Sequence, residues 1–496
     1  MQIHLCAVAL TAGVASAQLA IGTGGIAEIW NTNCASCHHE SGKGGGAGTR
    51  SMLDDEWAGG GDYLSLFKSV KHGMTDSGMP AYGETMSDAQ CWALVVYLTE
   101  LREKDFRKNG GGPKPKNNTY TSDHARFETQ DVVTEGLKVP WALDFFPDGR
   151  MILTNRPGAV KIYSGGEAGG TLSQAIEGTP KVFNSGQGGM MDVAVHPDFA
   201  RDEANAAGSG WIYLAYSDPR AVEGEKTSAN TKVVRGRVRA EGSSLTWVDQ
   251  ETIYEASPAT YSRASHHFGS RLAFSAADPD GKRYLFLSHG ERGTNDRSRK
   301  PDEPQGKIHR VFDDGSIPGD NPFIGKGIDS VWSVGHRNPQ ALVMDDAGGL
   351  WSTEHSTRGG DEFNLIERGR DYGWSTVCFG MNYNGSPHAL PWLDAEGNTG
   401  DIAMPLHVWM PSTGVCGMSI GKHGETLFPG WAGDFFAGGL SGENIWRLRV
   451  ADGKVTEREE IIHGIGRVRD VATGLDGAIY VVLNDPDKVI RLVPAK

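Results

Sequence analysis

Long apolar segments, an excess of positive charge and a dinucleotide-binding glycine motif are all missing from this 496-residue sequence. Because it has no run of eighteen apolar residues, it predicts no transmembrane helix. Its 48 Lys and Arg residues face 62 Asp and Glu residues, and the net charge of −14 argues against nucleic acid or an anionic membrane as a partner. No Gly-x-Gly-x-x-Gly motif follows a predicted strand and opens a helix, which argues against a Rossmann domain.

Glycine, in contrast, is abundant: 68 of the 496 residues, roughly twice the usual share. From residue 124 onward, short alternating strands are separated by turns such as Asp148-Gly149, Asp280-Gly281, Gly348-Gly349 and Asp476-Gly477. These turns need positive φ angles, which glycine adopts at little cost. Six imperfect units recur at a spacing typical of four-stranded blades. Residues 124–496 therefore predict an all-β six-bladed propeller, with a β-sandwich as the alternative.

The first seventeen residues resemble a secretory signal peptide. Leu5–Ala12 is mostly apolar, and the small residues Ala15-Ser16-Ala17 follow it as a candidate cleavage site. The first five residues carry no Lys or Arg, which is unusual for such a signal. We expect residues 1–17 to be removed and the protein to be periplasmic or secreted.

Residues 18–103 predict a small all-α domain. Ser87 and Gln90 form a capping-box pattern, and Cys91, Leu94, Val95 and Leu98 follow at helical spacing. Residues 104–123 contain three consecutive glycines and two prolines without apolar periodicity, which predicts a linker between the two domains.

The helical domain carries a covalent haem motif, Cys34-Ala35-Ser36-Cys37-His38. Two thiols at this spacing can bind the haem vinyl groups, and the adjacent His38 can ligate the iron. A zinc site would need a second ligand pair, and a thioredoxin-type dithiol would need a βαβ unit; the sequence predicts neither. We therefore expect one covalent haem c, held by Cys34, Cys37 and His38.

The second iron ligand is expected downstream. Met79 precedes Pro80, which favours an extended backbone in a loop and so presents the thioether to the haem. This segment is similar to the Met-Pro-Ala loop of small class I cytochromes c. Met74 and Met86 are the competing candidates.

The propeller segment resembles the soluble glucose/sorbosone dehydrogenase family, the pyrroloquinoline quinone (PQQ) enzymes also called aldose sugar dehydrogenases. The resemblance covers about residues 135–494 and implies a six-bladed propeller. It rests on ordered matches at Val139–Leu143, Pro147–Gly149, Gly186–Gly189, His196–Phe199, His267–Leu272, Gly315–Pro318, Asp320–Pro322, Gly335–Gln340, Gly360–Ile366 and Arg469–Val471.

The resemblance assigns His267 as the general base that takes a hydroxyl proton while hydride leaves the same carbon. Side chains alternate in a strand, so a strand here would place Phe268 and Leu272 on one face and His267 with Arg271 on the other. The resemblance also implies that Arg337 stabilises charge developing on the quinone. It assigns the remaining cofactor or substrate contacts to Asn338, Gln187 and Asp361.

Arg467 and Arg469 are two residues apart, so a strand would direct both guanidinium groups to one side. Paired guanidinium groups suit carboxylates, and the family cofactor carries three. The alternative is a solvated edge strand.

The resemblance further implies Ca²⁺ at the quinone, bound partly by the backbone carbonyls of Ser356 and Thr357. Ser441 stands where family members carry a lysine for the cofactor, which predicts weaker quinone binding. Residues 386–399 form an insertion that the family pattern does not explain.

Cys378 and Cys416 are 38 residues apart in a domain that we expect to be exported. Their spacing leaves open whether they form a disulfide. Cys91 lies on the apolar helix stripe and is expected to be a buried free thiol.

Together these features predict a quinohaemoprotein that oxidises an aldose at C1 by hydride transfer to PQQ. Its haem c would then pass the electrons to an external acceptor such as a cytochrome or a terminal oxidase. Two alternatives remain open: a sugar-binding propeller with an electron-transfer cytochrome and no quinone, or a cytochrome cd1-type reductase, which has eight blades and a second haem.

Overall fold

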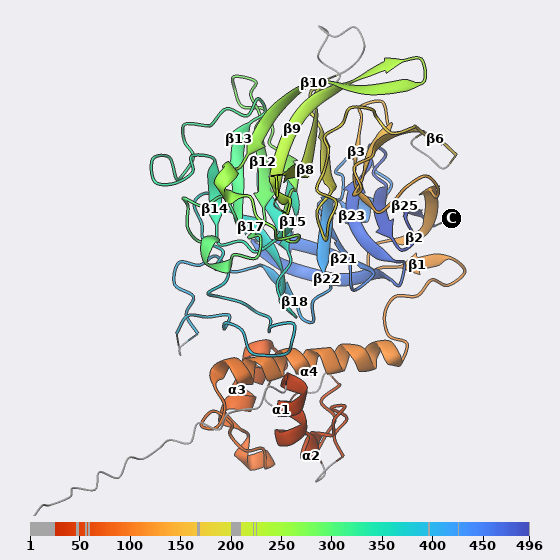
Figure 1. Ribbon diagram of the computed structural model, residues 1–496. Helices are drawn as coiled ribbons and strands as arrows, with labels where there is room; N and C mark the ends of the chain where they lie inside the picture. Colours follow the sequence, from red (N-terminus) through yellow and green to blue (C-terminus); the bar gives the residue numbers. More distant parts are fainter. Residues whose placement is uncertain are drawn as a thin grey trace, which may run out of the picture.

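The computed structural model describes residues 25–45, 49–54, 57, 60–165, 169–199, 210–221, 223–224, 226–394, 397–424 and 426–495. The expected signal peptide, residues 1–17, lies outside these residues. A small helical domain packs against a large β-propeller, and α4 (Asp88–Lys108) runs along the boundary between them (Figure 1). No helix in the described part of the chain combines the length and the apolar character needed to cross a membrane.

The helical domain forms as its sequence predicts. It contains α1 (Ile26–Asn33), α2 (Ala35–His38), α3 (Tyr63–His72), a 3-10 helix (Thr75–Ser77) and α4. At the start of α4, Ser87 accepts the backbone N–H of Gln90, and the Gln90 side chain accepts the backbone N–H of Ser87. This confirms the capping box. Cys91, Leu94, Val95 and Leu98 are all buried, as the apolar stripe predicts.

Six antiparallel sheets form the blades of the propeller. Blade 1 contains β3 (Pro140–Phe145), β4 (Met151–Asn155), β5 (Val160–Ser164) and β6 (Thr171–Leu172). Blade 2 contains β7 (Met190–Val195), β8 (Ile212–Arg220), β9 (Ser228–Glu241) and β10 (Ser244–Glu255). Blade 3 contains β11 (Leu272–Phe274), β12 (Tyr284–His289), β13 (Lys307–Phe312) and β14 (Val331–Val334).

Blade 4 contains β15 (Pro339–Met344), β16 (Leu350–Glu354), β17 (Asp361–Ile366) and β18 (His407–Trp409). Blade 5 contains β19 (Val415–Ile420), β20 (Phe435–Gly439), β21 (Asn444–Ala451) and β22 (Lys454–His463). Blade 6 joins β23 (Arg467–Thr473), β24 (Ile479–Asn484) and β25 (Lys488–Pro494) to β1 (Thr119–Thr121) and β2 (Arg126–Val133). This pairing of β2 with β25 closes the ring.

The six sheets confirm the propeller and exclude the β-sandwich. They also contradict a cd1-type reductase, whose body has eight blades.

Four aspartates connect neighbouring blades, of which Asp192, Asp361 and Asp470 are buried and Asp144 is half-buried. Each lies on one blade, and its carboxylate accepts a backbone N–H from the first strand of the next blade around the ring. The pairs are Asp144 with Val195, Asp192 with Leu272, Asp361 with Val415, and Asp470 with Leu143. These bonds tie together the strands that surround the propeller axis.

Both ends of the predicted linker differ from the structure. The predicted linker, residues 104–123, is shorter, because α4 continues to Lys108 and β1 begins at Thr119 within blade 6. Near the end of the helix, Arg107 forms ion pairs with Glu103 on α4 and with Glu460 on the propeller.

The helical domain is docked on the propeller through a mixed polar and apolar contact. The indole N–H of Trp92 donates to the Phe379 carbonyl at 2.9 Å, and the backbone N–H of Ile26 donates to the Gly385 carbonyl at 3.0 Å. Trp392 packs edge-on against Trp92, with ring centroids 5.4 Å apart. Trp392 belongs to the insertion 386–399, so part of that insertion serves as a docking surface for the helical domain.

Candidate active site

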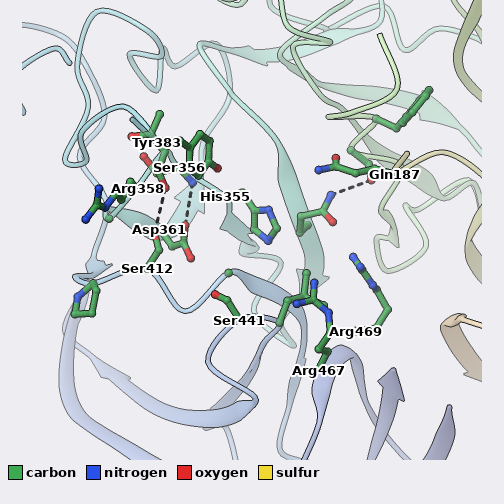
Figure 2. A pocket seen from close by; sticks show the side chains of 18 of the residues that line it. Gln187, His355, Ser356, Arg358, Asp361, Tyr383, Ser412, Ser441, Arg467 and Arg469 are labelled. Carbon is green, nitrogen blue, oxygen red and sulfur yellow. Dashed lines mark hydrogen bonds between the residues drawn. The ribbon is translucent and has the colours of Figure 1, made fainter. Parts of the chain in front are cut away.

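A cavity of about 480 Å³ lies where the blades converge (Figure 2). Every blade, or the segment leading into it, contributes to its wall. The contributors include Trp141 and Arg156 from blade 1, Gln187 and Met191 from blade 2, Phe268 and Gly269 before blade 3, Gln340 and His355–Gly359 from blade 4, Leu440 and Ser441 from blade 5, and Arg467 and Arg469 from blade 6. A cavity lined in this way lies on the propeller axis.

The cavity wall is rich in guanidinium groups, and some of their donor nitrogens lack partners among the described residues. Arg467 and Arg469 project from β23 and both line the cavity (Figure 2). Arg156, which sequence reasoning missed, is a third guanidinium in this wall. Among the described residues, Arg156 Nε, Arg469 Nε and His355 Nε2 are buried without a hydrogen-bond partner. Burial lowers the pKa of Arg469. Unpaired buried donors of this kind fit an anionic ligand with several carboxylates.

His267 does not lie in a strand, so the expectation that it shares a strand face with Arg271 is wrong. Its φ is +55°, Gly269 and Ser270 also have positive φ, and β11 begins only at Leu272. The tight loop directs the His267 backbone N–H to Gln187 Oε1, at 2.8 Å. Arg271 lies elsewhere, as a buried partner of the blade-connecting aspartates.

The His267 ring is positioned by Glu291, a buried residue that sequence reasoning missed. Nδ1 of His267 hydrogen-bonds to the Glu291 carboxylate. Burial, reinforced by the Arg337 guanidinium, holds the pKa of His267 far below its usual range. The ring is therefore neutral at pH 7. With Nδ1–H donating a hydrogen bond to the Glu291 carboxylate, Nε2 is the basic atom of the ring. His266, His267 and Glu291 are also close enough together to ligate a metal ion.

Arg337 and Asn338 stand behind the cavity wall and are not among its described lining residues. Arg337 donates to the His355 carbonyl at 3.2 Å, and Asn338 Oδ1 accepts the Gly269 N–H at 3.1 Å. Both side chains therefore hold residues that do line the cavity.

Ser356 and Thr357, the expected calcium ligands, are buried and line the cavity. Asp361 fixes their turn: Oδ1 accepts the Ser356 N–H at 3.0 Å and the Ser412 hydroxyl at 2.9 Å (Figure 2). The backbone carbonyl oxygens of Ser356 and Thr357 are candidate ligands for a hard cation, and that of Thr357 also accepts the Ser412 hydroxyl at 3.4 Å. Ser441 also lines the cavity, so the position expected to carry a lysine faces the ligand space.

The two cysteines of the propeller are not bonded to each other. Cys378 and Cys416 are both buried free thiols, so they form no disulfide. The Cys378 sulfur lies 3.5 Å from Thr357 Oγ1, and the Cys416 sulfur lies 3.6 Å from Arg469 Nη1. Cys91 is likewise a buried free thiol, as expected.

A second cavity, of about 370 Å³, lies inside the helical domain. Cys34, Cys37 and His38 line it, and His38 Nδ1 is buried without a partner in the described part of the chain. Met79 and Met74 both line it, and their backbones pair with each other. Met86 instead packs into the domain core. The structure therefore leaves Met79 and Met74 as candidates for the second iron ligand.

Helix α4 lies between the two cavities. Leu94, Val95 and Leu98 line the cavity of the helical domain, and Glu100 of the same helix lines the propeller cavity. The same helix therefore contributes to the walls of both cavities.

Comparisons with known proteins agree with this division. Residues 137–491 match the Glucose / Sorbosone dehydrogenase family model, and residues 24–98 match that of Cytochrome C oxidase, cbb3-type, subunit III. The chain is 36% identical over 360 residues to Aldose sugar dehydrogenase YliI of Escherichia coli strain K12, which covers 72% of this chain and 90% of that protein.

Solved structures share the propeller. The apo form of the soluble aldose sugar dehydrogenase from Escherichia coli has a TM-score of 0.63 at 33% identity, covering 74% of this chain and 100% of that one. A PQQ-bound aldose sugar dehydrogenase from Streptomyces coelicolor shares the fold, with a TM-score of 0.56 at 24% identity over 74% of this chain and 98% of that one.

The helical domain has its own relatives. It is 38% identical over 76 residues to the cbb3-type oxidase subunit FixP of Azorhizobium caulinodans, which is 15% of this chain and 26% of that protein. The match therefore covers about a quarter of FixP. The chain as a whole belongs to the glucose/sorbosone dehydrogenase family of oxidoreductases, and its propeller is preceded by a cytochrome c domain.

Proposed function

We propose that this protein oxidises an aldose at C1 by hydride transfer to PQQ and passes the electrons to its own haem c. The observation that carries the proposal is that α4 contributes to the walls of two cavities: one rich in guanidinium groups with unsatisfied donors, the other lined by a covalent haem motif. When bound, PQQ supplies the two-electron acceptor and haem c the one-electron relay.

The chain's own cations fit the three carboxylates of the quinone. Arg156, Arg467 and Arg469 supply planar donors, and Gln187 supplies an amide beside them. The carbonyls of Ser356 and Thr357 would hold Ca²⁺ at the same cavity. Arg337 and Asn338 support this wall from behind.

His267 acts as the base. Its neutral ring accepts the C1 hydroxyl proton at Nε2, while Glu291 holds Nδ1–H and fixes the ring orientation. The positive charge that develops on the ring is balanced by the Glu291 carboxylate, as in other oriented imidazole bases.

In the helical domain, Cys34 and Cys37 would bind the haem covalently, and His38 with Met79 would ligate the iron. Covalent haem attachment and the expected signal peptide agree with a periplasmic or secreted enzyme. Its electrons would pass to an external acceptor such as a cytochrome or a terminal oxidase.

The test is anaerobic mixing of purified protein, loaded with PQQ and Ca²⁺, with a panel of aldoses while the haem absorption bands are followed. We expect the haem to become ferrous after aldose addition, and His267→Gln to abolish this change without altering the haem spectrum. A haem that stays ferric with every aldose would refute the proposal.

The remaining alternative, a sugar-binding propeller without quinone, is favoured by Ser441 at the cavity wall. Titration of the apoprotein with PQQ distinguishes the two, because this alternative predicts no saturable binding.

A further inference from the structure

The propeller cavity is completed by the cytochrome domain. Among the described residues that line it, Glu100 is the one that α4 contributes, next to Arg358 and Tyr383 of the propeller. The question is whether Glu100 serves only to dock the domain or also contacts what enters the cavity.

Glu100 is held in a fixed orientation. Its two oxygens accept from Arg358 Nε at 2.7 Å and Nη2 at 2.6 Å, a bidentate pair (Figure 2 shows Arg358). One turn earlier on the helix, Val96 is fully buried against Gly359, so α4 cannot shift without losing this contact. A carboxylate positioned by a rigid helix and a bidentate partner is preorganised for a ligand.

The pair also keeps free hydrogen-bonding capacity. The Glu100 and Arg358 side chains are 22% and 32% exposed, and each carboxylate oxygen has a second lone-pair direction. Their charges cancel, so this end of the cavity suits a neutral polyol, whereas Arg156, Arg467 and Arg469 suit an anion.

Tyr383 adds an apolar surface beside this pair. It lines the same cavity and is 70% exposed, so the face of its ring is open to a ligand. An aromatic face together with planar polar groups matches a pyranose ring, which has apolar C–H faces and hydroxyls at its edge.

We propose that Glu100, Arg358 and Tyr383 form a subsite for the sugar ring and its hydroxyls, so that the cytochrome domain takes part in substrate recognition. This inference rests on the proposed function, since it assumes that the cavity accepts an aldose. The ring hydroxyls donate to Glu100 and accept from Arg358, and the ring face packs on Tyr383.

The test measures binding without turnover. The holoenzyme, loaded with PQQ and Ca²⁺, is titrated by calorimetry with 1,5-anhydro-D-glucitol, which lacks the C1 hydroxyl and so cannot be oxidised there. We expect Glu100→Gln to weaken binding about tenfold, the effect of losing one hydrogen bond to a charged group. The matched control is Glu103→Gln on the same helix. Its carboxylate bonds Arg107 rather than the cavity, so its affinity should equal that of the unmodified protein.

A second pair of variants keeps the test independent of domain docking. Tyr383→Ser should weaken binding and Tyr383→Phe should preserve it, because the ring provides the contact. Equal affinities of the unmodified protein, Glu100→Gln and Tyr383→Ser would overturn the subsite. If the unmodified protein binds the anhydro sugar through these residues but oxidises no aldose, the subsite stands and the proposed function fails.

Discussion

The contact between Gly359 and Val96 provides a direct test of how the two domains are held together. Gly359 has a φ of +89°, and a Cβ atom added there would lie 2.8 Å from Val96 Cγ1 on α4. Its next neighbours would be at 3.7 Å or more, which is ordinary contact. Gly359→Ala therefore forces one methyl group into the domain boundary.

The cost can be divided into two parts. Backbone strain at positive φ is about 1–3 kcal/mol, but it is present whether or not the domains are docked. The overlap with Val96 exists only in the docked state, and overpacking of this kind costs about 1–3 kcal/mol. The docked-to-undocked ratio should therefore fall about 5- to 150-fold.

The assay is hydrogen exchange at the Ile26 amide, which donates across the boundary to the Gly385 carbonyl. Its protection reports opening of the boundary, whereas amides inside β12 should be unaffected. Haem reduction after aldose addition should slow in parallel. The rate of turnover with a small acceptor that oxidises the quinone directly should stay the same.

The matched control is a double-mutant cycle with Val96→Ala, which removes the overlapping methyl group at a cost of about 1.6 kcal/mol of buried hydrocarbon. In that background Gly359→Ala should no longer reduce Ile26 protection. Equal losses of protection in both backgrounds would refute the reasoning, because they would show that the overlap with Val96 does not set the docking energy.

Three further predictions concern the cofactors. Ser441→Lys should tighten PQQ binding about tenfold or more in a titration of the apoprotein, through one added charge-assisted hydrogen bond; Ser441→Met, similar in length but neutral, should not, and equal affinities of the two variants would contradict this. Burial and, next, the Arg337 cation depress the pKa of His267, and the base works only above that pKa. Arg337→Gln should therefore raise the pKa of His267 and move the acid limb of kcat/KM to higher pH. An unmoved acid limb contradicts the assignment of His267 as the base. Met79→Leu should lower the haem reduction potential and remove the red absorption band of thioether-ligated ferric haem, while Met74→Leu should do neither; the reverse result would make Met74 the ligand.

The sequence predicts the fold well because its evidence is local. Glycine turns at Gly149, Gly281, Gly348 and Gly477 all adopt the positive φ that they were expected to need. The capping box at Ser87 depends only on residues of the same helix turn. Such features do not depend on distant contacts, so a single sequence contains enough information to predict them.

Sequence reasoning fails where a local conformation is imposed by distant contacts. His267 was expected in a strand, yet its positive φ is supported by Gln187, which is 80 residues away, and by Glu291. No alternation pattern reveals such a loop, although the following Gly269 is a weak sign of one. The docking role of Trp392 was equally hidden, because its partner Trp92 lies 300 residues earlier in the chain.

The position of α4 between the helical domain and the propeller explains why its residues have different roles. Leu94, Val95 and Leu98 line the cavity of the helical domain with apolar side chains, which exclude water from it. Propeller-facing residues must hold the domain, which Trp92 does by bonding the Phe379 carbonyl. An amphipathic helix has one apolar face and one solvated face. From Cys91 to Thr99, in contrast, α4 is packed on both sides and has almost no solvated face. The burial of nearly every residue from Cys91 to Thr99 is therefore the structural consequence of packing this helix between the cavity of the helical domain and the propeller.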